Sequence, residues 1–232
     1  MKYIDQMITE QVHLWAQHEA EAKREGEALG AWPIITVSRE FGARGAALAA
    51  VLGKRIGFKV WDKDLLHAIA EEGGGDERLL ASLDEHRRKA IDDAMRGAVS
   101  GSKHTNTAYF RALIRVVHTI DAHGKGIIVG RGANYISKST DILRVRVVCP
   151  FEERVRGYAE REGYSEKGAR KKIQTRDAER DDFVRHHFKR DHAAAADYDL
   201  VLNSSTFTLD QMADLVLLAY ETKVGKKPPT AK

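Results

Sequence analysis

The chain has 232 residues, which suffices for one large domain or two very small ones, and 43% hydrophobic with 31% charged residues is typical of a soluble globular protein. Its 38 basic and 34 acidic residues give a net charge of +4 and mix along the chain, so no nucleic-acid partner is expected. No apolar run reaches the ~20 residues of a membrane span, and no signal-peptide core is present, so the cytoplasm is the expected location. The single cysteine, Cys149, excludes an intramolecular disulfide and is predicted to be a buried, unreactive thiol.

Residues 1–30 predict a helix that precedes the main domain. Its apolar residues recur at helical spacing over the first half only, and they are Ile4, Met7, Ile8, Val12 and Trp15. Such a stripe either covers the core of its own domain or pairs two copies of the chain in a homodimer. The sequence is compatible with both arrangements.

After residue 30, short apolar runs alternate with helical stretches. The expected strands cover residues 34–37, 58–61, 126–129, 142–148 and 198–202. The expected helices cover residues 48–56, 63–72, 76–96, 109–123, 151–162, 165–190 and 209–220, with Asp62 and Asp76 as N-caps. This order predicts an α/β fold with a parallel sheet covered by helices on both faces. Residues 31–224 are expected to form one domain, and the Pro/Lys-rich residues 225–232 are expected to be disordered.

The loop after the first strand, residues 38–47, is the first candidate site. In parallel sheets of this kind, ligands bind at the carboxyl ends of the strands. Small residues there allow backbone N–H groups to surround an anion, and the following helix adds a partial positive charge at its N-terminus. Arg39 and Arg44 are placed to add bidentate phosphate contacts. Taken alone, the segment fits a tight turn with two exposed arginines equally well.

Two other basic segments point to the same edge of the sheet. Gly130-Arg131-Gly132 directly follows the third strand, and we interpret it as a phosphate clamp in preference to a surface ion pair. The charged stretch 170–190 is either a solvated helix with many ion pairs or a lid whose arginines reach a phosphate. His186, His187 and His192 do not have the spacing of metal ligands, so no metal site is predicted from them.

Four segments together resemble the cytidylate kinase-like family, which belongs to the P-loop nucleoside monophosphate kinases. They are residues 35–42 (ITVSREFG), 61–66 (WDKDLL), 128–136 (IVGRGANYI) and 197–203 (DYDLVLN). The resemblance covers roughly residues 34–220. It implies a five-stranded parallel sheet, an ATP phosphate loop, a monophosphate-binding insert at residues 74–108 and a lid at residues 165–192.

The resemblance also implies roles for individual residues. Arg131 faces the monophosphate beside Gly130, Arg176 and Arg180 belong to the lid, and Asp62 and Asp64 lie on the monophosphate side. The residues implied around the ATP phosphates are Arg39, Phe41, Gly42, Ala43, Arg44, Gly45, Ala46 and Ala47. ATP and Mg²⁺ are the implied cofactors, with Mg²⁺ ligands that the resemblance does not identify, and the implied partner is a small-molecule nucleotide.

This sequence departs from the family pattern inside the phosphate loop. Gly45 stands at the usual lysine position and Ala47 at the usual hydroxyl position, while Val129 replaces an aspartate before Gly130. Arg44 is the expected substitute for the lysine, which makes Arg44, Arg131, Arg176 and Arg180 the candidate catalytic residues. The leading hypothesis is a kinase that moves the ATP γ-phosphoryl group to a nucleoside monophosphate such as CMP. The alternative is a catalytically impaired nucleotide-binding sensor or interaction protein.

Overall fold

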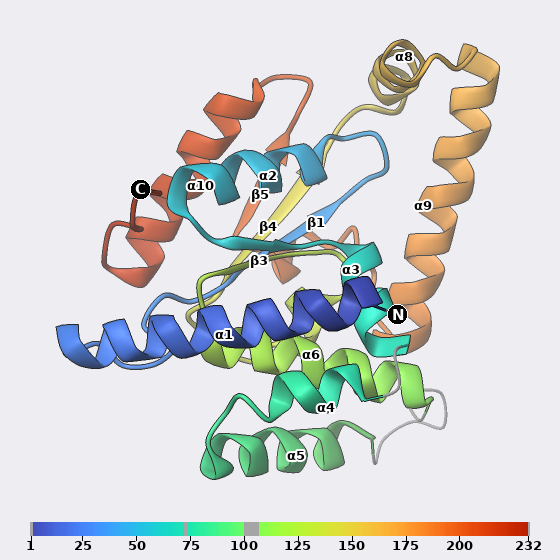
Figure 1. Cartoon of the computed structure of the whole chain (residues 1–232). Helices are drawn as coiled ribbons and strands as arrows, with labels where there is room; N and C mark the ends of the chain where they lie inside the picture. Colours follow the sequence, from blue (N-terminus) through green and yellow to red (C-terminus); the bar gives the residue numbers. More distant parts are fainter. Residues whose placement is uncertain (1, 72–73, 100–106, 232) are drawn as a thin grey trace.

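The computed structural model describes residues 2–71, 74–99 and 107–231. They form a central parallel sheet with helices around it (Figure 1). The strands are β1 (Ile35–Arg39), β2 (Lys59–Trp61), β3 (Gly126–Val129), β4 (Leu143–Val148) and β5 (Leu200–Asn203). They lie in the order β2-β3-β1-β4-β5, and each neighbouring pair is parallel. Because β1 pairs with both β3 and β4, the loops that follow β1 and β3 leave the sheet side by side.

Helices cover both faces of this sheet, as the sequence predicts. One face carries α2 (Gly45–Ile56) and α10 (Leu209–Val224), and the other carries α1 (Lys2–Glu25), α3 (Lys63–Glu71), α4 (Gly75–Leu80), α5 (Glu85–Val99) and α6 (Ala108–His123). Ile127 and Val129 of β3 belong to the hydrophobic core under α2 and α10. Ile128, which lies between them, belongs to the core on the opposite face of the sheet, under α1, α3 and α6. This alternation follows from the two-residue period of a strand, and it explains why all four residues of β3 are apolar or glycine and buried.

A pair of helices, α8 (Phe151–Glu162) and α9 (Glu166–Phe188), lies beyond one end of the sheet (Figure 1). The two helices pack on each other through a small core of their own, formed by Val155, Ala159, Ala169 and Ile173. Ser165 caps α9, because its hydroxyl accepts a hydrogen bond from the N–H of Gly168. The segment for which the sequence suggests a lid is therefore a long helix that passes the carboxyl ends of the strands.

The apolar stripe of α1 packs on the protein's own core. Ile8 is 2% exposed and Trp15 is 5% exposed. The Trp15 ring stacks on His123 of α6 with ring centroids 4.0 Å apart, and it also stacks on Trp61 at the end of β2. Of the two arrangements that the sequence allows for this stripe, the structure has the helix covering its own domain, which leaves Ile8 and Trp15 unavailable to a second copy.

The prediction of one helix over residues 76–96, capped by Asp76, is wrong in two respects. It forms two helices, α4 and α5, because Asp84 accepts a hydrogen bond from the Arg87 N–H and starts a new helix. Asp76 is not an N-cap. It is buried, and its carboxylate pairs with Arg115 of α6, 2.7 Å away. The helical period alone could not reveal that this carboxylate faces inward.

Smaller differences occur near the last strands. A short helix α7 (Ala133–Ile136), absent from the sequence expectations, follows the loop after β3, and a 3-10 turn η1 (Ala195–Asp197) precedes β5. Strand β5 begins two residues later than expected, and α10 continues to Val224. Residues 225–231, expected to be disordered, lie against the domain, with the N–H of Ala231 bonded to the carbonyl of Arg55.

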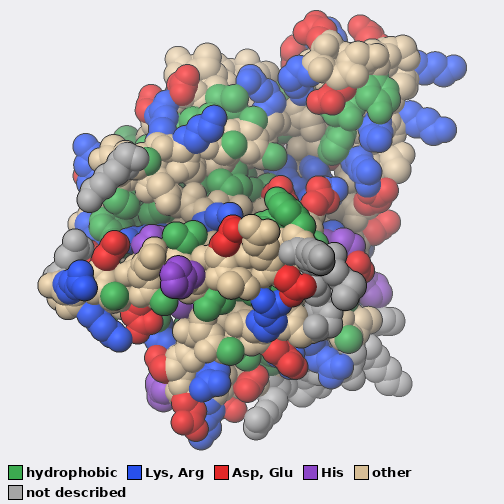
Figure 2. Space-filling view, in the orientation of Figure 1, with side chains coloured by type: hydrophobic (Ala, Val, Ile, Leu, Met, Phe, Trp, Pro, Cys, Tyr) green, Lys and Arg blue, Asp and Glu red, His purple; other side chains and the backbone are tan. Residues whose placement is uncertain are grey.

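The surface mixes both signs of charge. Figure 2 shows acidic and basic side chains interspersed over α1, α4 and α5, in agreement with their mixing along the sequence. Within the described residues, no helix is both long and apolar enough to span a bilayer. Cys149 is half-buried, and burial raises the pKa of its thiol, which keeps it protonated at neutral pH.

Candidate functional site

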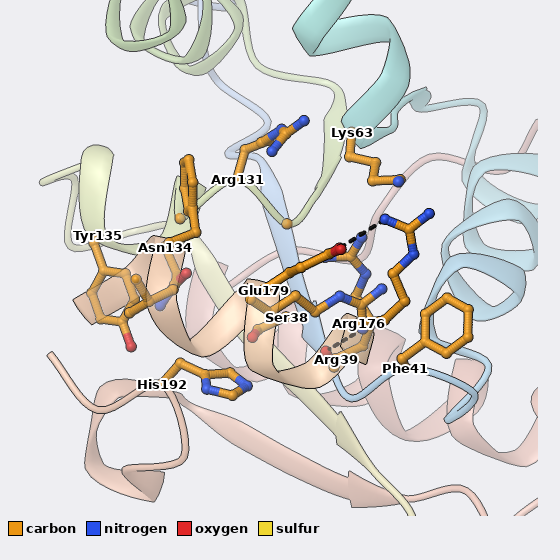
Figure 3. A pocket seen from close by; sticks show the side chains of 15 residues that line it. Ser38, Arg39, Phe41, Lys63, Arg131, Asn134, Tyr135, Arg176, Glu179 and His192 are labelled. Atoms are coloured by element: carbon orange, nitrogen blue, oxygen red, sulfur yellow. Dashed lines mark hydrogen bonds and ion pairs between the residues drawn. The ribbon is translucent and has the colours of Figure 1, made fainter. Parts of the chain in front are cut away.

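A cavity of about 260 Å³ lies where the loops after β1 and β3 meet α9 (Figure 3). Its walls come from the end of β1, the start of α3, the loop after β3 with α7, the inner side of α9 and the segment that follows α9. The lining residues are Ser38, Arg39, Phe41, Lys63, Gly130, Arg131, Gly132, Asn134, Tyr135, Arg176, Glu179, Arg180, Phe183, Val184 and His192. The position at the carboxyl ends of neighbouring parallel strands is the one at which such sheets bind ligands.

The walls of this cavity carry a strong excess of positive charge. Four arginines and Lys63 line it, and the one acidic lining residue is Glu179, whose carboxylate pairs with Arg176 at 2.7 Å. Figure 3 shows the Lys63 amine and the Arg176 guanidinium pointing toward each other across the cavity. Clefts with walls of one sign concentrate the opposite charge, so this site is built to attract an anion.

We call Arg39, Arg131 and Arg180 the pocket arginines, because they share the cavity and have no carboxylate partner in the described part of the chain. The Arg180 guanidinium donates to the carbonyl of Arg39 at 3.0 Å and lies over the Phe41 ring. The Arg131 guanidinium lies 5.5 Å from the Phe183 ring centroid, and its Nε is buried without a hydrogen-bond partner. Ring faces and a carbonyl position these groups without neutralising them.

Burial and mutual repulsion act on the same three groups. Burial, followed by repulsion from Arg180 and Arg131, lowers the pKa of Arg39 to about 9. Burial also lowers the pKa of Arg180, although Asp177 opposes this effect. Both guanidiniums remain charged at neutral pH, so the site holds its positive charge at a free-energy cost that a bound anion would relieve.

A second set of arginines, the paired arginines Arg146 and Arg154, lies behind the loop after β1. Arg154 pairs with Asp177 of α9 and, at 3.5 Å, with Glu40 of the loop. It also donates to the carbonyl of Phe41 at 3.1 Å. Arg146 lies 3.9 Å from the same Glu40 carboxylate. These contacts hold α8, α9 and the loop together as one unit.

Asp177 completes the connection between the loop and α9. Its Oδ1 accepts a hydrogen bond from the N–H of Phe41 at 2.8 Å, so one backbone donor of the loop is already occupied by a carboxylate. Other backbone N–H groups of the loop have no helical partner. The first helical hydrogen bond of α2 runs from the Leu48 N–H to the Arg44 carbonyl. The N–H groups of the three preceding residues therefore have no helical acceptor.

The wall opposite Lys63 is polar but not basic. The Tyr198 hydroxyl lies 2.8 Å from the His192 carbonyl and 3.2 Å from Ser38 Oγ. The His192 ring is 2.6 Å from Asp181, yet burial, followed by repulsion from Arg146, lowers its pKa. A neutral imidazole with hydroxyl neighbours is suited to hold a polar uncharged group, whereas the pocket arginines are suited to hold anionic oxygens.

Comparison with known proteins identifies the family. Residues 34–206, about three quarters of the chain, match the profile of the cytidylate kinase-like family. The chain belongs to the cytidylate kinase-like family. This membership and the parallel fold support a kinase-type role, and the family match covers every element that lines the cavity.

Several known proteins are similar to this chain in structure or in sequence. A crystal structure of an uncharacterised protein from Eubacterium ventriosum has the same fold, with a TM-score of 0.65, 19% identity and coverage of 82% of this chain and 98% of that one. The protein TT1252 from Thermus thermophilus gives a TM-score of 0.47 at 21% identity, covering 81% and 97%. A stretch of 99 residues is 27% identical to a uronate isomerase from Corynebacterium glutamicum, spanning 42% of this chain and 19% of that enzyme.

The structure brings together about half of the residues that the family resemblance singles out. Those that line the cavity are Arg39, Phe41, Gly130, Arg131, Arg176 and Arg180. Those that do not line it are Gly42, Ala43, Arg44, Gly45, Ala46, Ala47, Asp62 and Asp64. The cavity is therefore bounded by the start of the loop after β1 and by α9, and residues 42–47 do not line it.

Local structure explains where the outlying residues are. Arg44 is exposed, precedes α2 in a left-handed conformation with φ 65°, and does not line the cavity. Asp62 is engaged as the N-cap of α3, where its carboxylate accepts from the Leu65 N–H at 2.9 Å. Lys63, which sequence reasoning did not select, lines the cavity in place of its two acidic neighbours.

The described residues do not form a resident Mg²⁺ site. No group of three or more histidine, cysteine or acidic side chains in the described ranges is arranged to hold a metal. Glu179 is paired with Arg176, Glu40 with Arg154, and Asp62 with backbone N–H groups. Kinases hold Mg²⁺ through one or two carboxylates together with substrate phosphates, so these contacts identify no Mg²⁺ ligand among the described residues, and we derive no step through the ion.

Proposed function

We propose that this protein is a nucleotide kinase that transfers the γ-phosphoryl group of ATP to a nucleoside monophosphate, with CMP as the first acceptor to test. The observation that carries the proposal is the cavity at the carboxyl ends of β1 and β3, lined by three pocket arginines that pair with no carboxylate among the described residues. Phosphoryl transfer requires little covalent chemistry from a protein, and it depends on positioning and on neutralising phosphate oxygens.

The proposed roles follow from where each arginine is anchored. Arg131, in the loop after β3, binds the monophosphate of the acceptor. Arg176 and Arg180, on α9, approach the cavity from the opposite side and neutralise the phosphates between donor and acceptor. Arg180 is also bonded to the Arg39 carbonyl, so the position of α9 and the position of the loop after β1 are coupled.

The test is a direct product assay. Purified protein at high concentration is incubated with MgATP and with CMP, UMP, dCMP, AMP or GMP in turn, and diphosphates are resolved by anion-exchange chromatography. We expect equal amounts of CDP and ADP, and we expect Arg131→Met to lower kcat/KM for the acceptor by ten- to hundredfold. Arg24→Met, an exposed change on α1 with the same loss of charge, is the matched control. Absence of product with every acceptor contradicts the proposal.

A second function is favoured by one specific observation. Gly45 and Ala47 supply neither the amine nor the hydroxyl that the phosphate loop of such kinases usually contributes. The second candidate function is therefore that of a nucleotide-binding sensor or interaction module that retains the pocket but not the reaction. It predicts calorimetric binding of ATP or CMP with no CDP formed, and measurable turnover rules it out.

A further inference from the structure

Gly45 has no backbone reason to be glycine. It is the first residue of α2, and its φ lies outside the left-handed region that favours glycine. A Cβ placed on it would lie 2.6 Å from Cβ of Arg39 and 3.1 Å from Cγ of Arg39. Real Cβ atoms do not approach other carbons so closely, and the atoms involved belong to the rigid start of the Arg39 side chain. The absence of a side chain at Gly45 therefore makes room for Arg39.

The other end of the Arg39 side chain lies against the second loop. A Cβ placed on Gly130 would lie 2.0 Å from Nη1 of Arg39, and Gly130 itself has a left-handed φ of 79°. The side chain thus extends from the first turn of α2 to the loop after β3. Its guanidinium is at the point where the two loops of the cavity meet, beside Arg131.

A structural role does not account for this arrangement. Buried arginines that hold a fold together are paired with carboxylates or bonded to carbonyls, as Arg154 is here. The Arg39 guanidinium has no ion pair with a carboxylate in the described ranges, and the repulsion from Arg180 and Arg131 acts on it more strongly than the attraction of Asp62 and Asp64. Burying a like-charged group beside others is unfavourable unless an anion joins them.

We propose that Arg39 is a catalytic residue that contacts the polyphosphate and supplies the positive charge of the lysine missing at Gly45, reaching the site from the end of β1. The inference rests on the proposed function. In the transfer, a bond forms between an acceptor phosphate oxygen and the γ-phosphorus, and the bond from that phosphorus to the β,γ-bridging oxygen breaks. The electron pair leaves with ADP, and Arg39 neutralises charge without giving up a proton.

The first test measures binding of inorganic tripolyphosphate by calorimetry at constant ionic strength. We expect Arg39→Met to weaken binding by about ten- to hundredfold, the effect of losing a charged hydrogen-bond donor. Arg44→Met and the charge-matched Arg24→Met should change binding by less than about threefold. Equal binding by wild type and Arg39→Met, or an equal loss in Arg44→Met, overturns the role of Arg39 while leaving the proposed function intact. Failure of the wild type to bind tripolyphosphate overturns both.

The melting temperature of the Arg39→Met variant provides a second test. If Arg39 is held in the site for ligand binding, the unliganded Arg39→Met protein should melt at the wild-type temperature or above it, since a buried unpaired charge is removed. A clear fall in its melting temperature shows that Arg39 supports the fold, and it overturns the proposal.

Moving the cationic side chain from position 39 to position 45 provides the sharpest test. Arg39→Gly removes the Cβ that blocks position 45, so the double variant Arg39→Gly/Gly45→Lys has space for the usual lysine. We expect the double variant to bind tripolyphosphate at least tenfold more tightly than Arg39→Gly and to recover part of its kcat with MgATP and CMP. Gly45→Lys alone should melt below wild type because of the contact with Arg39. A double variant that binds no better than Arg39→Gly contradicts the proposal.

Discussion

Two sets of arginines lie on either side of the loop after β1, one buried and one half-buried, and they differ in how their charge is balanced. The paired arginines, Arg146 and Arg154, are 3% and 8% exposed and share the carboxylate of Glu40. The pocket arginines, Arg39, Arg131 and Arg180, line an open cavity and pair with no carboxylate among the described residues. The cost of burying a charge applies to both sets, but the protein's own acids offset it in only one.

The difference separates architecture from function. Arg154 links α8, α9 and the loop after β1 into one rigid unit through Asp177 and the Phe41 carbonyl. The bond from Arg180 to the Arg39 carbonyl connects that unit to the pocket arginines. The paired set thus maintains the unbalanced charge of the pocket set.

The largest effect is expected from breaking the paired set. Arg154→Met leaves Asp177 and Glu40 half-buried without their main cation and removes the bond to the Phe41 carbonyl. Loss of one partner from such a cluster costs about 3–5 kcal/mol, so the free energy of unfolding measured in urea should fall by about that amount. Arg156→Met is the matched control, because Arg156 lies on the same helix, is paired with Glu153 and is 55% exposed.

This control should lose no more than about 0.5 kcal/mol, as is usual for exposed ion pairs. If Arg154→Met costs no more than Arg156→Met, the paired set is not architectural, and the contrast between the two sets disappears.

The next largest effect concerns the pocket arginines, and here an increase in stability is expected. Tripolyphosphate at one hundred times its dissociation constant should stabilise the wild-type protein by about 2.7 kcal/mol, which corresponds to a rise in melting temperature of roughly 5–10 °C. The rise should diminish in Arg131→Met, although that variant is expected to be as stable as wild type without ligand. Sodium chloride at matched ionic strength is the control, and an equal rise with chloride means that the anion is not bound at a defined site.

Acid should weaken the fold while leaving both sets of arginines charged. Burial lowers the pKa of His123 to about 4 and has the same effect on His118. Because the folded protein favours the neutral rings, their contribution is complete above pH 6.5 and is lost as the pH falls from 6.5 toward 4. At pH 5 the loss should be roughly 2 kcal/mol per histidine.

The His123 ring stacks on Trp15, so tryptophan fluorescence during urea titrations at pH 7 and pH 5 measures this loss. The variant His123→Phe should reduce the dependence on pH, while replacement of the exposed His13 by phenylalanine should not. An unfolding free energy that stays constant between pH 7 and pH 5 contradicts the prediction.

The sequence was sufficient for the sheet and for one side of the cavity. Strand order in a parallel fold places the loops after β1 and β3 together, which is why Arg39 and Arg131 could be selected from sequence alone. The paired set could not be found in the same way. The bond from the Phe41 N–H to Asp177 joins residues 136 positions apart, and no periodic pattern indicates which of the aspartates on α9 faces the loop.

The role of Gly45 was hidden for a similar physical reason. In the sequence it appears as a lost lysine, and the nearest arginine inside the loop, Arg44, is the natural substitute. Only the three-dimensional structure shows that the side chain of Arg39 occupies the space above Gly45, whereas Arg44 is exposed. Which of two neighbouring side chains enters a site depends on backbone angles that the sequence pattern does not specify.

The smallest effect is expected at Arg44, which belongs to neither set. Its left-handed backbone, φ 65° and ψ 14°, is costly for any residue with a Cβ, and glycine avoids that cost while losing more chain entropy on folding. Arg44→Gly should therefore raise the free energy of unfolding by about 0.5–1 kcal/mol in urea titrations, and tripolyphosphate should bind with an affinity within about twofold of wild type. A tenfold loss of affinity would instead place Arg44 among the groups that hold the phosphate, as the sequence first suggested, and the contrast would then extend to a third, exposed arginine whose charge also depends on the ligand.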